Sequence, residues 1–305
     1  MSVVVFGSIN IDLVIQSPRF PKAGETIIGN SFYTAPGGKG ANQAVAAARM
    51  GAPVHMVGRV GKDVYGKVLL DNLKENNVNT EFILQDEEQP TGTAIITVND
   101  LAENTIVTAP GANGQLEGKD IKNLEKLLEK ASVLLLQFEV SFDYIIQAAK
   151  IAKEMGVTII QDPAPARAVP KEIFESIDII TPNETEAAMI VGFPVNSEEN
   201  IQKAAAYFHE NGVPEVIIKL GGKGAYWSKE GSGKFIQPHK VKAIDTVAAG
   251  DAFNGALAAG LYNGLSTVQA IDWAMAAGAL STTRKGAQPS LPYKNEVMNI
   301  MKTTS

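Results

Sequence analysis

Strand-like and helix-like segments alternate through the middle of this 305-residue chain. The strand-like segments are rich in Val, Ile and Leu, and the segments between them have helical periodicity. The strand-like segments are 132–138, 157–162, 177–183 and 215–221, and two clear helical ones are 143–156 and 199–212. Such alternation predicts a parallel sheet with helices on both faces. We therefore expect an α/β fold with three layers, α/β/α, and a mostly parallel central sheet.

Two stretches break this alternation, at approximately residues 11–34 and 91–109. The pattern of residues 91–109 predicts two strands joined by a tight turn near Asp100 to Glu103, with no helix between them. Taken alone, it could be an ordinary edge hairpin. The sequence shows no linker, low-complexity tract or repeat, and its hydrophobic content of 45% is enough for a sizeable core. We expect residues 1–305 to form a single domain that carries the two stretches as insertions.

Charge and cysteine content exclude several classes of protein. A net charge of −6 and the lack of a long basic run argue against a nucleic-acid partner. The sequence has no Cys and three His, which excludes disulfides and makes a dedicated zinc site unfavourable. No apolar run approaches the roughly 18 residues of a membrane span, and the N-terminus resembles no secretory leader. We expect a cytoplasmic enzyme without a membrane partner.

The stretch DTVAAGDAFNG, residues 245–255, places a carboxylate directly after small residues that open a helix. Ala248, Ala249 and Gly250 leave their backbone N–H groups accessible to an anion at the positive end of that helix. Asp251 beside this anion hole could accept a proton from an attacking hydroxyl while the amides stabilise a phosphoryl group. A capped helix packed on a sheet would explain the same residues, because Asp commonly starts helices.

Another glycine-rich stretch, PGGKGANQ at residues 36–43, also opens a helix, which ends near Gly51. It is not a Walker A loop, because the required Gly-Lys-Ser/Thr spacing occurs neither here nor at 221–226. It is not a dinucleotide fingerprint either, because the first strand is followed by a single glycine, Gly7. These absences weaken the interpretation of the chain as a Rossmann oxidoreductase.

Several segments in order along the chain resemble the ribokinase-like (PfkB-type) sugar kinase family. They are GSINID near the start, GGKGANQAVAAARMGA at 37–52, TGTAIITVN at 91–99, DPAPAR at 162–167, TPNETEA at 181–187, DTVAAGDAFNGA at 245–256 and TRKGAQPS at 283–290. The resemblance covers essentially the whole chain. It implies that the two insertions form a small β-sheet lid over a sugar site, which would exclude water during transfer.

Polar residues at predicted strand ends and on the glycine-rich loop could bind sugar hydroxyls. The resemblance implies that the sugar ligands are Asn10, Asp12, Gly38, Lys39, Asn42 and Glu139, together with Asp251. Without it, Asn10 and Asp12 could belong to a turn or an Asx cap. Lys39 could equally be a solvated surface amine, and Glu139 an acid at a helix start.

For the nucleotide, the resemblance implies ATP contacts at Asn183, Lys219, Gly221 and Gly250, beside Asp251. The nearby glycines Gly222 and Gly224 also offer backbone amides, as do Ala248 and Ala249. Thr is frequent at position 219 in related kinases. Lys219 could therefore reach a phosphate or point to solvent.

Two cations are also implied by the resemblance. Glu186, three residues after Asn183, corresponds to a family motif linked to Mg²⁺, here through water; a plain helix cap would also explain the pair. The positions that would hold K⁺, mostly through backbone oxygens, are Asp245, Val247, Ser281, Arg284, Gly286 and Ser290.

Within the family the chain is most similar to the members that phosphorylate ribose. The resemblance implies transfer of the γ-phosphate of ATP to the 5-hydroxyl of D-ribose, giving ribose 5-phosphate and ADP, with Asp251 as the general base. It also implies a homodimer formed through the lid. The open alternatives are a kinase for 2-deoxyribose, another sugar or a nucleoside, and a sugar sensor without catalytic activity.

Overall fold

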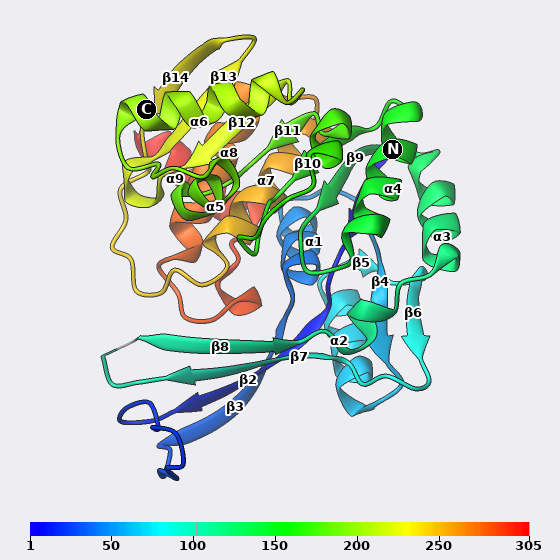
Figure 1. Cartoon of the computed structure of the whole chain (residues 1–305), viewed down its shortest axis with the longest axis vertical. Coiled ribbons are helices and arrows are strands. Elements are labelled where there is room, and N and C mark those ends of the chain that lie inside the picture. Colours follow the sequence, from blue (N-terminus) through cyan, green and yellow to red (C-terminus); the bar gives the residue numbers. More distant parts are fainter. Residues whose placement is uncertain (102, 305) are drawn as a thin grey trace.

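Two β-sheets organise the chain: a ten-stranded sheet between helices, and a four-stranded sheet that projects away from it (Figure 1). The computed structural model of the protein describes residues 1–101 and 103–304. The large sheet comprises β1 (Ser2–Phe6), β4 (Val54–Gly61), β5 (Val78–Asn79), β6 (Ile83–Asp86), β9 (Ala131–Leu136), β10 (Thr158–Gln161), β11 (Ile179–Ile180), β12 (Glu215–Lys219), β13 (Ala225–Lys229) and β14 (Ser232–Ile236).

The large sheet is mostly parallel, which confirms the predicted fold class. Its order is β14-β13-β12-β11-β10-β9-β1-β4-β5, with β6 paired to β4. Among the described residues, the antiparallel pairings of this sheet are those of β13 with β12 and with β14, which form an edge ribbon that the sequence patterns did not predict. The strand expected at 177–183 is shorter, Ile179–Ile180, because Pro182 lacks an N–H group and Asn183 already caps the next helix.

Helices cover both faces of this sheet, because the strand residues alternate between two apolar cores. In β1, Val3 and Val5 belong to one core, and Val4 and Phe6 to the other. The first core packs against α1 (Lys39–Arg49), α2 (Val64–Glu75), α7 (Ala249–Tyr262), α8 (Thr267–Ser281) and α9 (Lys294–Thr304). The other core packs against α3 (Gly118–Leu128), α4 (Phe142–Glu154), α5 (Glu184–Val191) and α6 (Glu198–Glu210).

The four-stranded sheet has the order β3-β2-β7-β8. Its strands, β2 (Asn10–Gln16), β3 (Ser31–Gly37), β7 (Gly92–Val98) and β8 (Asn104–Ala109), come from the two stretches without helical signals. β7 and β8 pair antiparallel; the predicted turn between them includes residue 102, which lies outside the described residues. Asp12 is on one face of this sheet, and Leu13 and Ile15 are on the other.

Within the described ranges, 1–101 and 103–304, none of the helices is long and apolar enough to cross a membrane.

Candidate active site

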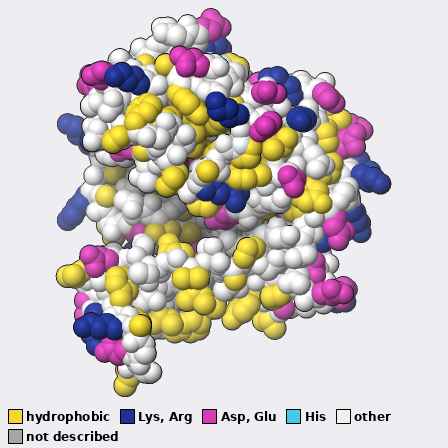
Figure 2. Space-filling model, in the orientation of Figure 1, with side chains coloured by type: hydrophobic (Ala, Val, Ile, Leu, Met, Phe, Trp, Pro, Cys, Tyr) yellow, Lys and Arg dark blue, Asp and Glu magenta, His cyan; other side chains and the backbone are white. Residues whose placement is uncertain are grey.

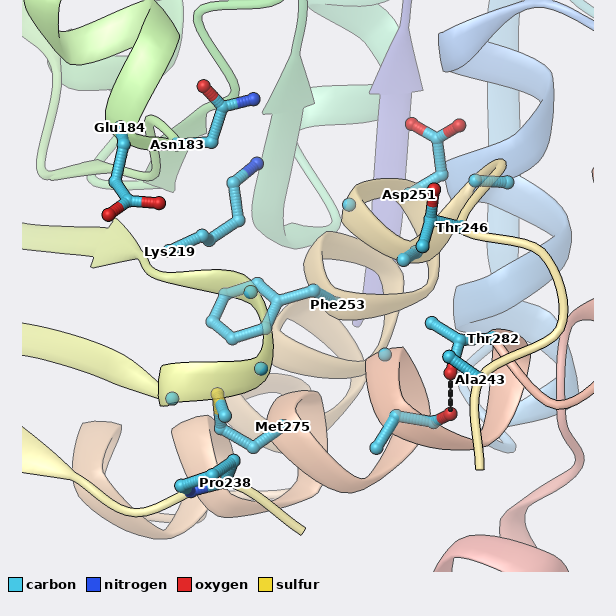
Figure 3. Close-up of a pocket in the computed structure, with 18 of the residues that line it drawn as sticks. Asn183, Glu184, Lys219, Pro238, Ala243, Thr246, Asp251, Phe253, Met275 and Thr282 are labelled. Carbon is cyan, nitrogen blue, oxygen red and sulfur yellow. Dashed lines mark hydrogen bonds between the residues drawn. The ribbon is translucent and has the colours of Figure 1, made fainter. Parts of the chain in front are cut away.

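A cavity of about 830 Å³ opens beyond the carboxyl ends of β10 and β12, where open α/β sheets bind ligands. Of the predicted site residues, Lys39, Asn183, Glu186, Lys219, Gly221, Gly222, Gly224, Ala248, Ala249, Gly250 and Asp251 line it. In Figure 3 Asp251 and Lys219 lie toward one end of the pocket, and Phe253, Met275 and Pro238 lie toward the other. The cavity therefore has a charged end and a largely apolar end.

Asp251 lies in the first turn of α7 and is only 5% exposed. Its carboxylate accepts hydrogen bonds from Asn42 Nδ2 over 2.9 Å and from Gln43 Nε2 over 3.1 Å. Burial raises the pKa of Asp251 to about 6, against the opposing charge of Lys39. The side chain is thus a stronger base than an ordinary aspartate, yet it is still ionised at neutral pH.

The first turn of α7 has the properties expected of an anion hole. Ala248 precedes the helix in the left-handed conformation, with φ of 59°, and no side chain caps the helix there. The amides of a first helical turn have no acceptor within the helix. A Cβ atom at Gly250 would lie 3.4 Å from Lys219 Nζ, so the ammonium lies directly beside this turn. Positive charge and amide groups therefore meet at one point.

Lys219 lines the cavity and does not point to solvent, one of the two alternatives that the sequence left open. Its Nζ donates to Asp162 Oδ1 over 2.9 Å and lies 3.9 Å from Glu186 Oε2. Burial opposes the charge of Lys219, but these two carboxylates outweigh burial and raise its pKa. Asn183 and Glu186 also form a capping box at the start of α5, with bonds of 2.7 and 2.8 Å, so the pair both caps a helix and lines the cavity.

The predicted sugar ligands gather near Asp251, where β2, α1 and the end of β9 meet. Asp12 lies against Gly37, because a Cβ there would be 2.4 Å from its carboxylate oxygens. Glu139 Oε2 accepts from the backbone N of Lys39 over 3.1 Å. Burial, helped by the charges of Glu139 and Asp251, raises the pKa of Asp12 to about 7. The carboxylates form a cluster that a set of hydroxyl donors could satisfy.

Lys39 supplies positive charge to this cluster. Burial opposes that charge, but Asp251, Asp162 and Glu139 outweigh it and raise the pKa of Lys39. The neighbouring Gly38 has φ of 89°, and a Cβ there would lie 2.7 Å from the backbone N of Asn10, so the loop needs glycine. Lys39 is therefore a partly buried cation within the cluster, and a merely solvated amine is the wrong interpretation.

Two side-chain amides, those of Asn10 and Asn42, also belong to this cluster. Asn10 Oδ1 accepts from Asn113 Nδ2 over 2.7 Å, which holds Asn10 at the junction of the two sheets. Asn42 donates to Asp251, but its buried Oδ1 atom has no hydrogen-bond partner within the described residues. That orphaned acceptor lies where a ligand hydroxyl could satisfy it.

The predicted K⁺ positions fall on two loops that are hydrogen-bonded to each other. Asp245 accepts from Val247 N over 3.0 Å and from Gly286 N over 2.9 Å. Its own backbone N donates to Thr282 O, next to Ser281. The side chains of Arg284 and Ser290 have other partners, Glu296 and Ala287 O. The Asp245 carboxylate thus bridges these segments, and carboxylate and carbonyl oxygens are the donor type that a hard cation takes.

Sequence reasoning missed two residues that connect this site, Gln43 and Asp162. Both were detectable in principle. Gln43 is one residue beyond Asn42 and four beyond Lys39, so it lies on the same side of α1. Asp162 is the last residue of the predicted strand 157–162, and Glu139 directly follows the predicted strand 132–138, so both lie at strand ends. Their roles depend on long-range contacts, which local patterns do not reveal.

A parallel sheet covered by helices, with a carboxylate at an amide-rich helix start and a β-sheet beside the cavity, defines a class of small-molecule phosphotransferases. Within this class, the chain belongs to the pfkB family of carbohydrate kinases, whose sequence model it matches over residues 1–294.

Individual relatives agree along nearly the whole length. The chain is 42% identical to a ribokinase of Haemophilus influenzae over 300 residues, 98% of each protein. It is 39% identical to a ribokinase of Mus musculus over 301 residues, 97% of this chain and 93% of that one. The solved structure of Arabidopsis thaliana ribokinase complexed with ribose and ATP superposes with a TM-score of 0.91 at 34% identity, covering 99% of this chain and 98% of the other.

Proposed function

We propose that this protein transfers the γ-phosphate of ATP to the 5-hydroxyl of D-ribose, giving D-ribose 5-phosphate and ADP. The observation that carries the proposal is the position of Asp251, a buried base between a cluster of polar side chains and an amide-rich helix start. The similarity to a ribokinase solved with ribose and ATP supports both substrates. As an enzyme that uses ATP in this way, we expect it to act in the cytoplasm.

On the acceptor side, the proposed sugar ligands are Asn10, Asp12, Gly38, Lys39, Asn42 and Glu139. A sugar hydroxyl would donate to the orphaned Oδ1 of Asn42, and Asp12 and Glu139 would accept from others. Asp251 then takes the proton of the 5-hydroxyl as its oxygen attacks the terminal phosphate. Base catalysis contributes roughly 10²–10⁴-fold, so positioning and charge stabilisation must supply the rest.

On the donor side, the amides of residues 248–250 and the ammonium of Lys219 would stabilise charge on the transferred group. Asn183, Gly221, Gly222 and Gly224 line the same cavity, and its apolar end has room for the base. Mg²⁺ bound with ATP would neutralise phosphate charge, and Glu186 would hold it through water.

K⁺ would bind at the two linked loops, through Asp245 and backbone oxygens of Val247, Ser281, Arg284, Gly286 and Ser290. Asp245 already bridges these loops through its bonds to Val247 N and Gly286 N. Its oxygens keep further lone pairs for a cation. A bound cation would add to the positive field beside the start of α7.

The four-stranded sheet would act as a lid and as the surface of a homodimer. Its face away from Asp12 carries exposed apolar side chains, Ile15, Phe32, Ile95 and Val107, which the strand registers place side by side. Figure 2 shows hydrophobic side chains gathered along this sheet, below the hollow that separates it from the main body. A second copy of the chain would cover such a patch.

The test is ADP release from Mg·ATP with ribose, 2-deoxyribose, fructose and adenosine, each in K⁺ and in Na⁺ at equal ionic strength. We expect preference for ribose and faster turnover in K⁺. Preference for another acceptor would contradict the assignment of ribose as the substrate but would leave the proposed mechanism intact. Equal rates in both salts would contradict the proposed K⁺ site. Absence of turnover with all four acceptors would favour the alternative of a sugar sensor without catalytic activity.

A further inference from the structure

One side-chain amide connects two carboxylates of the cavity. Gln43, on α1, is fully buried, and its Nε2 donates to Asp251 Oδ1 over 3.1 Å and to Asp162 Oδ2 over 2.9 Å. Its Oε1 accepts from Gln137 Nε2 over 2.8 Å. Both donors and the acceptor of Gln43 are therefore engaged, and its orientation is fixed from three sides.

Asp162 extends this connection to the donor side. It follows β10, is 1% exposed, and divides its two oxygens between different partners. Oδ2 accepts from Gln43, and Oδ1 accepts from Lys219 Nζ over 2.9 Å. Lys219 in turn lies beside Gly250, at the amide-rich start of α7. Three hydrogen bonds thus run from the base Asp251 to the cation beside the phosphate-binding amides.

We propose that Gln43 and Asp162 are positioning residues that hold the Asp251 carboxylate and the Lys219 ammonium in fixed relation, so that the attacking hydroxyl and the terminal phosphate are aligned. The inference rests on the proposed function, since it takes Asp251 as the base and places the phosphate beside Lys219. It adds a coupling between the acceptor and donor halves of the cavity. A misplacement of about 1 Å in such an alignment can cost about 10²-fold in rate.

A contribution to folding stability does not by itself explain the hydrogen-bonded chain of Asp251, Gln43, Asp162 and Lys219. A buried ion pair is often no more stabilising than apolar side chains of similar volume. The pair of Arg59 and Asp120 offers a comparison, because it is also buried, joins β4 to α3, and lies away from the cavity. Gln43 differs because both of its N–H donors are used on carboxylates that line the cavity.

Charged groups from several elements surround Asp251. They are Lys39 on α1, Asp12 on β2, Glu139 after β9, Asp162 after β10, Lys219 at the end of β12 and Glu186 on α5, and the charges that shift the pKa of Asp251 are those of Lys39 and Asp162. Among them, Asp162 is joined to Asp251 through a single intervening group, the Gln43 amide. A charge added at position 43 and a charge removed at position 162 should therefore affect the base in opposite directions.

The experiment compares Gln43→Glu and Asp162→Asn, two substitutions that preserve size. We expect kcat to fall by about tenfold or more in both, with each KM changed by less than about threefold, because alignment and not binding is impaired. The acid limb of kcat/KM should move up by about one pH unit in Gln43→Glu and down in Asp162→Asn. If Gln43→Glu fails to fold, Gln43→Met tests the kcat loss at constant KM.

Asp120→Asn is the matched control, because it disrupts a buried ion pair outside the cavity. It should lower Tm and leave the acid limb in place. The carboxyl pKa of Asp251, followed by ¹³C NMR and assigned with Asp251→Asn, gives a readout that needs no sugar. Opposite movements there would support the link even if ribose proved not to be the substrate. The proposed positioning role would be overturned if the pKa of Asp251 stayed the same in both Gln43→Glu and Asp162→Asn. It would also be overturned if these substitutions raised KM and left kcat unchanged.

Discussion

The carboxylate of Asp251 is more deeply buried than its position beside a glycine, at the start of a helix, suggests. Burial raises its pKa to about 6. We expect Asp251→Asn to lower kcat by at least about 10²-fold, because the amide cannot accept the hydroxyl proton. Binding of the nonhydrolysable analogue Mg·AMP-PNP, measured by calorimetry, should change little. If Asp251→Asn turned over substrate nearly as fast as the unaltered protein, Asp251 would not be the general base.

Asp12 gives a prediction for stability against pH. Its pKa rises from 3.8 in the unfolded chain to about 7 in the folded one, so the folded state binds the proton more tightly. Stability is therefore lost as pH rises from about 4 through about 7. Asp12→Asn removes this cost, and we expect Tm at pH 8 to rise by about 2–4 °C while the KM for the sugar increases.

The gain from Asp12→Asn should shrink toward zero as the pH approaches 4, where the unfolded side chain also binds its proton. Thermal unfolding measured between pH 4 and 8 provides the check. Asp71→Asn is the control: this exposed carboxylate has a lowered pKa because of its hydrogen bond to Lys67, so its removal should give no gain at pH 8. A pH-independent effect of Asp12→Asn would contradict the argument.

At the scale of elements, the start of α7 combines an unusual backbone conformation with a place in the wall of the cavity. Ala248 has φ of 59°, a conformation in which a β-branched side chain is strongly strained. Ala248, Ala249 and Gly250 line the cavity, and no side chain caps the first turn of α7 there. Ala248 and the proposed anion hole thus belong to the same loop.

Two substitutions at position 248 separate backbone conformation from side-chain bulk. Ala248→Val should lower kcat/KM for ATP by about tenfold or more, because it disfavours the left-handed conformation. Ala248→Gly, the matched control, permits that conformation and should keep activity within about threefold. Steady-state kinetics with ATP varied provides the measurement, and equal activity in both variants would show that the conformation is not needed.

For the whole molecule, the four-stranded sheet carries an apolar face that is exposed to solvent. Phe32 and Val107 are 61% and 69% exposed on its face away from Asp12. Val107→Lys should shift a dimer toward monomer, because it charges a surface that a second copy would cover. Light scattering after size exclusion, over a range of concentrations, gives the mass. Val68→Lys on α2 is the control, and a monomer at every concentration in the unaltered protein would refute the homodimer.

Much of the architecture could be read from the sequence. Helical and strand periodicity predicted the parallel sheet, and the segments without helical signals supplied all four strands of the smaller sheet. The antiparallel ribbon of β13 and β14 was missed. At 177–183, the propensity of the apolar residues predicted a full strand, but Pro182 and the cap at Asn183 ended it early.

The sequence by itself determined the local chemistry: a carboxylate after small residues at a helix start, a glycine-rich loop with Lys39, and polar residues after strands. Tertiary structure alone decided which of these side chains meet. Gln43 joins Asp251 and Asp162 across 208 and 119 positions of the chain, and Lys219 turns inward because Asp162 lies opposite it. The physical reason is that local sequence governs backbone conformation and periodicity, whereas these contacts depend on the order and register of the strands.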